Sequence, residues 1–270
     1  MSDIVLSAGV RSNLLNLQQT SDLITSTQTK LATGKRVNSA LDNTTNFSTA
    51  QGLSNRASDL SSLLDAMSTG INTIQAANNG LSAITKLVQS AQSLASQALQ
   101  TSDTTVRSSL ATQFGSILTQ VDQLAGDAGF NGINLLNGNN LTVVLNESGT
   151  SSVTVTGVTD TSTGLSIAAA ANAWAGNADI TAAQTDLTAA LSTLRSQAQS
   201  LGSNLSTVQI RQDFTKSMIN TLKTGADSLT LADTNEEGAN LLALQTRQQL
   251  SSTALSFAAQ ADRNVLRLFQ

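Results

Sequence analysis

The sequence of 270 residues contains no histidine and no cysteine. It therefore has no imidazole to act as a general base near neutral pH and no thiolate to act as a nucleophile. Zinc sites built from these residues and disulfide frameworks are excluded for the same reason. Because the 18 acidic residues are scattered along the chain, we expect no catalytic, cofactor or metal site and predict that the protein is not an enzyme.

Proline is also absent, although average usage of about 5% would give roughly thirteen in a chain of this length. A proline inside a helix removes a hydrogen bond and costs about 3 kcal/mol, so a chain without proline permits long unbroken helices. Aromatic residues make up only 3% of the chain. The core must therefore rest on aliphatic side chains, which suits helices packed side by side.

Charge and hydropathy limit the partners and the location of the protein. The formal net charge is −4 and the basic residues form no stripe, so we expect no nucleic-acid partner. No apolar run approaches the ~18 residues of a membrane span, and we expect no membrane insertion. The first six residues lack the basic start and apolar segment of a secretory signal peptide. We therefore expect any export to follow a route without a cleaved signal peptide.

Apolar residues recur at alternating steps of three and four, which is typical of helices that pack along a heptad seam. The first such stretch follows Val10, Leu14, Leu17, Ile24 and Leu31, with polar residues at two steps, and should end at Gly34. The other stretches are residues 60–98, which would form a helix about 60 Å long, 106–124, 187–222, and 235 to the C-terminus.

Between the helical stretches, local composition predicts loops, turns and a hairpin. Residues 35–52 are rich in Asn, Ser and Thr and are predicted to be a loop. Two β-branched runs, 141–145 and 153–156, predict a small β-hairpin, and Asn-Gly pairs at 131–132 and 137–138 predict tight turns.

Two further local predictions concern single residues. Thr234 and Glu237 stand three apart before an apolar run, which is a capping-box pattern. Trp174 is interpreted as a packing residue beside the hairpin.

The predicted fold is mainly α: a long antiparallel helical rod or coiled-coil bundle, with a small β-hairpin region and paired N- and C-terminal helices. The predicted segments are an N-terminal helix (1–34), a linker (35–53), N-terminal rod helices (54–126), a hairpin and small central region (127–182), a C-terminal rod helix (183–230) and a C-terminal helix (231–270).

The two terminal helices suggest self-assembly. An isolated amphipathic helix gains little from propensity and depends on burying its apolar face. Even when paired, these helices would leave apolar residues outward: Ile4, Leu6, Leu15, Leu242, Leu266 and Leu268. We predict that the ends are weakly ordered in a lone subunit and fold when neighbouring copies cover them. The candidate interface residues are Val10, Leu14, Leu17, Ile24, Leu31, Leu241, Leu244, Leu250, Phe257, Val265, Leu268 and Phe269.

Three motifs resemble segments of bacterial flagellins. They are LATGKRVNSALD at residues 31–42, FNGINLL at 130–136 and NVLRLFQ at 264–270. They lie far apart and in the order of the family, and the resemblance covers the chain except for roughly residues 140–180. The opening MSDIVLS and the stretch LDNTTNF at 41–47 are similar to flagellins of alphaproteobacteria. The variable outer domain of longer flagellins is nearly absent.

This resemblance implies a structural subunit that polymerises into the extracellular flagellar filament for swimming motility, the terminal helices forming its inner core. It implies as partners further copies of the chain or sister flagellins, the flagellar export apparatus and a chaperone, and the filament cap and hook-associated proteins. The alternatives are a hook–filament junction protein, which shares the terminal helices, or a cytoplasmic signalling coiled coil, which has similar periodicity.

One departure from the family bears on immune sensing. Many flagellins carry an arginine-rich patch, LQRVREL, through which the mammalian innate immune receptor for flagellin senses them. In the matching stretch, residues 88–94, Ser90 and Gln92 replace the two arginines and Ser93 replaces the glutamate. Because guanidinium hydrogen bonds worth about 1.5–3 kcal/mol each are missing, the resemblance predicts poor sensing.

Overall fold

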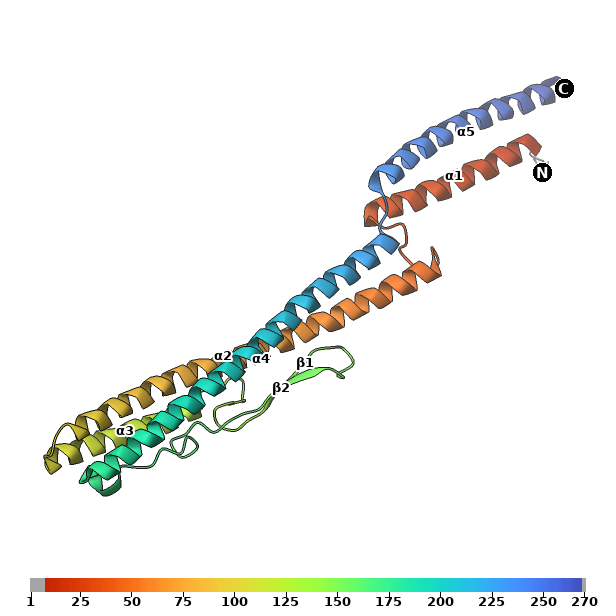
Figure 1. Ribbon diagram of the computed structural model, residues 1–270. Coiled ribbons are helices and arrows are strands. Elements are labelled where there is room, and N and C mark those ends of the chain that lie inside the picture. Colours follow the sequence, from red (N-terminus) through yellow and green to blue (C-terminus); the bar gives the residue numbers. More distant parts are fainter. Residues whose placement is uncertain (1–7, 269–270) are drawn as a thin grey trace. The chain divides into compact units, whose positions relative to one another are not determined.

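The computed structural model describes residues 8–268, without the side chains of Asp262 and residues 265–268. The described residues form five α-helices, a 3₁₀-helix and a two-stranded sheet (Figure 1). These elements are α1 (Ala8–Thr33), α2 (Thr44–Leu99), α3 (Thr104–Asp127), β1 (Leu141–Val144), β2 (Ser152–Val155), η1 (Ala171–Trp174), α4 (Asn177–Thr230) and α5 (Thr234–Leu268). The predicted mainly α fold with a small hairpin is confirmed.

The chain divides into two compact units. The terminal unit comprises residues up to 55 together with those from 221 onward, and the central unit comprises residues 56–220. Helices α2 and α4 each contribute to both units.

The central unit is built around one aliphatic core shared by α2, α3, α4 and the hairpin. Its fully buried side chains include Met67, Ile74, Leu81, Ile84, Phe114, Leu136, Trp174, Ile180, Leu187 and Leu194. Trp174 is fully buried, and its ring neighbour is Phe114 of α3, with 4.9 Å between the ring centroids. Its predicted packing role is confirmed, but its aromatic partner lies on α3 and not on the hairpin.

Two glycines of α2 allow other segments to approach this helix closely. A Cβ on Gly70 would lie 2.6 Å from Cγ2 of Val143 in β1. A Cβ on Gly80 would lie 2.6 Å from Cβ of Ala128 and 2.9 Å from Cδ1 of Leu136. Since real Cβ atoms do not approach other atoms this closely, any larger residue at either position would displace the hairpin or the segment after α3.

The predicted hairpin is confirmed as an antiparallel pair in which Leu141 faces Val155 and Val144 faces Ser152. Along β1, Leu141 and Val143 are buried whereas Thr142 is exposed. This alternation is expected for a strand with one face on a core. The hairpin is therefore held against the helices by one face only.

The FNGINLL motif forms the turn that closes α3. Asn131 and Gly132 both have positive φ, and the backbones of Phe130 and Ile133 exchange two hydrogen bonds across them, as predicted for an Asn-Gly turn. The Asn134 side chain then donates to the carbonyls of residues 125 and 126, both at 2.8 Å. It thereby provides hydrogen-bond donors for carbonyl groups at the end of α3, which have no partner within the helix.

Three predicted boundaries are wrong. Residues 44–52 are helical, so the predicted loop is shorter. The Asn43 side chain accepts a hydrogen bond from the Asn46 N–H at 2.9 Å, and this cap starts α2 within a stretch whose polar composition predicts a loop. Helix α4 begins at Asn177 instead of residue 183, and α3 continues one residue beyond Gly126.

The predicted capping box of α5 is also wrong. The side chain of Asp233 accepts hydrogen bonds from the N–H groups of Asn235 and Glu236, at 2.9 and 3.3 Å. Asp233 is therefore the N-cap, and Thr234 is already the first helical residue. Glu237 forms an ion pair with Lys30 of α1.

Candidate functional site

Helices α1 and α5 of the terminal unit pair side by side and run antiparallel, so that Ala8 and Leu268 lie at the same end of the pair (Figure 1). This confirms the predicted pairing of the terminal helices. Buried and half-buried residues form one heptad row on each helix. The rows are Val10, Asn13, Leu17, Thr20, Ile24, Thr27 and Leu31 on α1, and Glu237, Leu241, Leu244, Gln248, Ser251, Leu255 and Ala258 on α5.

The α1 row differs from the predicted one at alternate steps. Asn13, Thr20 and Thr27 lie in the seam, where the sequence pattern predicts Leu14 and the polar residues one position later. Thr20 and Thr27 are only 4% and 6% exposed, and Thr20 Oγ1 donates to the carbonyl of Asn16 at 2.8 Å. Because threonine buries less apolar area than leucine, the pair gains less hydrophobic stabilisation from its seam than an entirely aliphatic seam would give.

Large apolar side chains remain on the outside of the pair. They are between 38% and 67% exposed, and we call them the outer residues: Leu14, Leu15, Leu23, Leu242, Leu250 and Phe257. The predicted outward positions of Leu15 and Leu242 are thus confirmed. Leu242, Leu250 and Phe257 lie on one face of α5, and exposed apolar side chains that gather on one face mark interaction sites in soluble proteins.

The predicted interface residues fall into three groups. Those in the seam contact the partner helix of the same chain: Val10, Leu17, Ile24, Leu31, Leu241 and Leu244. Leu14, Leu250 and Phe257 belong to the outer residues. The side chains of Val265, Leu266 and Leu268 lie outside the described residues, as do Ile4, Leu6 and Phe269. Leu23 was missed because it lies outside the predicted heptad row.

The motif at residues 31–42 forms a junction between the helices of the terminal unit. Gly34 ends α1 with φ of +68°, as predicted. Its carbonyl accepts from the N–H of Ala232 at 3.0 Å, while the N–H of Arg36 donates to the Thr230 carbonyl at 2.8 Å. The motif therefore fixes the end of α1 to the point where α4 ends and α5 begins.

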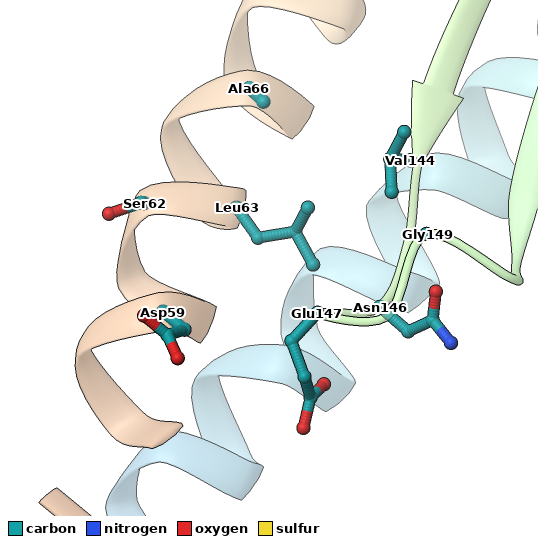
Figure 2. Close-up of a pocket in the computed structure, with 8 residues that line it drawn as sticks. All are labelled: Asp59, Ser62, Leu63, Ala66, Val144, Asn146, Glu147 and Gly149. Atoms are coloured by element: carbon teal, nitrogen blue, oxygen red, sulfur yellow. The ribbon is translucent and has the colours of Figure 1, made fainter. Parts of the chain in front are cut away.

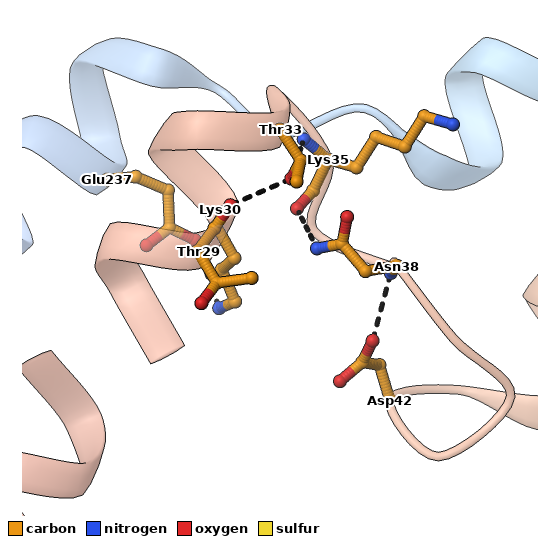
Figure 3. Close-up of polar contacts among 7 residues, drawn as sticks. All are labelled: Thr29, Lys30, Thr33, Lys35, Asn38, Asp42 and Glu237. Atoms are coloured by element: carbon orange, nitrogen blue, oxygen red, sulfur yellow. Dashed lines mark hydrogen bonds and ion pairs between the residues drawn. The ribbon is translucent and has the colours of Figure 1, made fainter. Parts of the chain in front are cut away.

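The Asp42 carboxylate locks the turn that follows (Figure 3). Its Oδ2 accepts from the backbone N–H groups of Asn38 and Ser39, both at 2.9 Å. The N–H donors of Ser39 and Asn38 hold the pKa of Asp42 below its ordinary value, because they stabilise the charged form.

An ion pair joins α1 to α5, and a shallow groove lies beside it between the two helices. Lys30 Nζ lies 3.1 Å from Glu237 Oε1, and Figure 3 shows the two side chains meeting between the helices. The groove beside them encloses about 340 Å³. It is lined by Leu23, Thr27, Lys30, Glu237, Asn240, Ala243, Leu244 and Arg247.

The titratable groups with shifted pKa values do not form a catalytic cluster. Hydrogen bonds lower the pKa of Asp42 in the terminal unit and of Glu147 at the hairpin, whereas burial raises the pKa of Asp160. Within residues 8–268, no three acidic side chains are grouped so that they could hold a metal ion. None of the described helices is long and apolar enough to cross a membrane.

The residues that replace the arginine-rich patch lie on α2. Ser90 and Ser93 are exposed, and each hydroxyl donates to a carbonyl of its own helix. Gln92 is half-buried, and its Nε2 donates to Thr188 Oγ1 of α4 at 3.4 Å. None of the three side chains presents a positive charge.

Two family models match the chain: the N-terminal helical region of bacterial flagellin over residues 8–141, and its C-terminal helical region over residues 180–269. Flagellin FljK of Caulobacter vibrioides is 32% identical, and the match covers 100% of this chain and 99% of the relative. The chain belongs to the bacterial flagellin family. It is a short flagellin of alphaproteobacterial type, as its motifs predict.

Two further relatives are also flagellins. Flagellin FljM of the same organism is 32% identical, with 100% and 99% coverage, and a flagellin of Brucella melitensis is 28% identical over the full length of both chains. A crystal structure of Bacillus cereus flagellin is similar at 20% identity and a TM-score of 0.48, covering 57% of this chain and 88% of that one.

The family gives the flagellin its function. It is a structural subunit that polymerises into the extracellular filament of the bacterial flagellum and serves motility. The comparisons give no support to a hook–filament junction protein or a signalling coiled coil. The terminal pair and its outer residues are therefore the candidate surfaces for assembly.

Proposed function

We propose that this flagellin assembles by burying the outer residues of its terminal pair between neighbouring copies. The observation that carries this proposal is the contrast between a seam that buries Thr20 and Thr27 and large apolar side chains left outside, such as Leu242 and Leu250. Burying apolar surface contributes about 25 cal/mol per Å². In a filament, neighbouring copies of the chain are available to bury these outer residues.

The same contrast supports a terminal pair that gains much of its order on assembly. Ordering the backbone costs about 1–2 kcal/mol per residue, and a two-helix pair with a partly polar seam offsets little of that cost. The central unit has its own aliphatic core. The lone subunit should therefore combine a folded central unit with a weakly ordered terminal pair.

Seeded growth followed by electron microscopy tests the role of the terminal pair. We expect the full chain to extend short filament fragments into micrometre filaments, whereas a variant lacking the chain from Asn235 onward should add nothing while its central unit stays helical by circular dichroism. Extension by the truncated variant would contradict the proposal. Addition of only a few copies by the full chain would favour the junction protein.

A matched pair of single variants tests the outer residues directly. Leu250→Ser removes a side chain that is 67% exposed, and Gln249→Ser changes its exposed neighbour. We expect Leu250→Ser to raise the critical concentration for polymerisation roughly tenfold, since each 1.4 kcal/mol corresponds to a factor of ten. Gln249→Ser should leave it unchanged, and equal effects of the two variants would argue against the proposal.

Family membership supports the remaining partners. We propose that the chain leaves the cell through the flagellar export apparatus with a chaperone and without a cleaved signal peptide. It then polymerises beneath the filament cap and next to hook-associated proteins. The four similar flagellins of Caulobacter vibrioides support co-assembly with sister flagellins. The absence of histidine and cysteine supports a purely structural, non-enzymatic role.

Poor sensing by the innate immune receptor for flagellin is also proposed, because Ser90, Gln92 and Ser93 offer no guanidinium group. Receptor reporter cells measure this sensing. A response equal to that given by a flagellin carrying the arginine-rich patch would contradict it.

A further inference from the structure

The central unit carries an apolar protrusion that is not part of its core. Ile210 and Phe214 of α4 are 66% and 54% exposed and lie one helical turn apart. The opposite side of α4 is buried at Val208 and Thr215, and Gln212 donates to Ser68 of α2 at 2.9 Å. With 100° per residue, Ile210 and Phe214 therefore point away from α2 and from the core.

The same unit contains an apolar groove that no part of α4 lines. The groove encloses about 400 Å³ between α2 and the hairpin. Figure 2 shows Leu63 of α2 reaching toward Val144 of β1, with Asp59 on the α2 side and Glu147 on the hairpin side of one end of the groove. The remaining lining residues are Ser62, Ala66, Asn146 and Gly149. The groove thus has an apolar floor and an acidic end.

The charges beside the protrusion and the groove are complementary. Glu147 is paired with Arg56, whereas Asp59 has no ion-pair or hydrogen-bond partner for its side chain among residues 8–268. Arg211 lies next to Ile210, is exposed, and likewise has no such partner within the described residues. An unpaired arginine therefore accompanies the apolar protrusion, and an unpaired aspartate borders the groove.

We propose that the Ile210–Phe214 protrusion of one copy docks into the groove between α2 and the hairpin of a second copy, with Arg211 meeting Asp59. The protrusion cannot fill its own groove, because it points away from α2, which forms one wall of that groove. A contact between two different patches is heterologous, and a heterologous contact that does not close generates an open helical assembly. This contact is separate from the terminal pair, since every residue involved lies in the central unit.

Charge reversal of the full chain tests the docking. Arg211→Glu would place an acid against the acidic groove, and Asp59→Arg would place a base against Arg211. We expect each single variant to raise the critical concentration for seeded polymerisation at least roughly tenfold, because like charges across an interface are costly. The double variant should return it to near the unmodified value. Normal polymerisation of the single variants would overturn the proposal. A double variant whose critical concentration stays as high as that of the single variants would also overturn it.

Cross-linking gives a second readout with no background, because the chain has no cysteine. Ser62→Cys combined with Ile210→Cys uses two exposed positions, one in the groove and one on the protrusion. Mild oxidation of filaments should yield a ladder of covalent multimers, as a head-to-tail contact requires. The control pairs Ser62→Cys with Val106→Cys, on the exposed face of α3, and should give no ladder. Absence of a ladder from the first variant, or a ladder from both, would overturn the docking.

These results separate the two surfaces. Normal growth of Arg211→Glu together with impaired growth of Leu250→Ser would remove the docking proposal and leave the terminal-pair proposal standing. Impaired growth of Arg211→Glu together with normal growth of Leu250→Ser would remove the terminal-pair proposal and leave the docking proposal standing.

Discussion

Arg107 is the charged side chain with the largest structural role in the central unit. It is only 7% exposed. Its Nε donates to the carbonyls of Ala98 and Thr101, at 3.1 and 2.7 Å, and its Nη1 donates to the Ala175 carbonyl at 3.1 Å. Its Nη2 donates to the side chain of Asn177. One guanidinium therefore joins the end of α2 to the start of α4.

Replacing Arg107 should destabilise the central unit strongly. Arg107→Met removes every donor and leaves the buried carbonyls unsatisfied, so we expect the free energy of unfolding to fall by about 3 kcal/mol. Thermal denaturation followed by circular dichroism measures the effect. Arg195→Met, at an exposed position of α4, is the control and should have little effect. Equal melting temperatures for the two variants would contradict this role.

Asp160 is a buried carboxylate whose two oxygens have no hydrogen-bond partner within the described part of the chain. Burial raises the pKa of Asp160, and the side chain of Gln197 offsets only part of that rise. The Oε1 atom of Gln197 is also buried without a partner in the described residues. Burial disfavours the charged carboxylate, so the folded state favours the neutral acid.

This raised pKa makes stability fall as pH rises. Below the ordinary aspartate pKa of 3.8, Asp160 is protonated in both states and makes no difference. As pH rises above that value, Asp160 ionises in the unfolded state at a lower pH than in the folded state. The free energy of unfolding therefore falls until pH exceeds the raised folded pKa. We expect Asp160→Asn to raise the free energy of unfolding at pH 7 by about 1–3 kcal/mol and to flatten this part of the pH profile. Asp65→Asn, on the exposed face of α2, should do neither, and an unchanged profile for Asp160→Asn would contradict the account.

At the scale of elements, the sequence predicts the helices better than their ends. Long heptad rows without proline predict α2, α3, α4 and α5, because periodicity over many residues leaves no other regular structure. The starts of α2 and α5 each depend on the side-chain hydrogen bonds of one residue, Asn43 and Asp233. Composition does not show which of several neighbouring polar residues makes such a bond.

The start of α5 gives a direct test of this point. Asp233→Ala removes the acceptor for the N–H groups of Asn235 and Glu236 and should destabilise the helix by about 1 kcal/mol. Thr234→Ala changes the residue that the sequence pattern predicts as the cap and should have a smaller effect. Helicity of assembled filaments on heating measures both, and a larger effect of Thr234→Ala would restore the capping box.

The seam of the terminal pair shows a second limit of sequence reading. Leu14 and Asn13 both continue a heptad row from Val10 to Leu17, and hydrophobicity favours Leu14. The structure places Asn13 in the seam and leaves Leu14 outside. A sequence pattern shows which helix faces are apolar, whereas only the packed pair shows which face is covered within the chain.

At the scale of the whole molecule, the two surfaces proposed for assembly differ in how far the sequence predicts them. The outer residues of α1 and α5 follow from amphipathic helices and could be predicted in part, as Leu15 and Leu242 show. The groove between α2 and the hairpin could not, because it exists only once Val144 is placed opposite Leu63. Residues at least 78 positions apart in the sequence, such as Ala66 and Val144, must meet before the groove forms.

Hydrogen exchange, compared between the lone subunit and the filament, tests the central claim most directly. The account predicts that backbone amides of α1 and α5 exchange rapidly in the subunit and become strongly protected in the filament, while those of α3 are protected in both states. Slow exchange of α1 and α5 in the lone subunit, with no gain in protection on polymerisation, would contradict it.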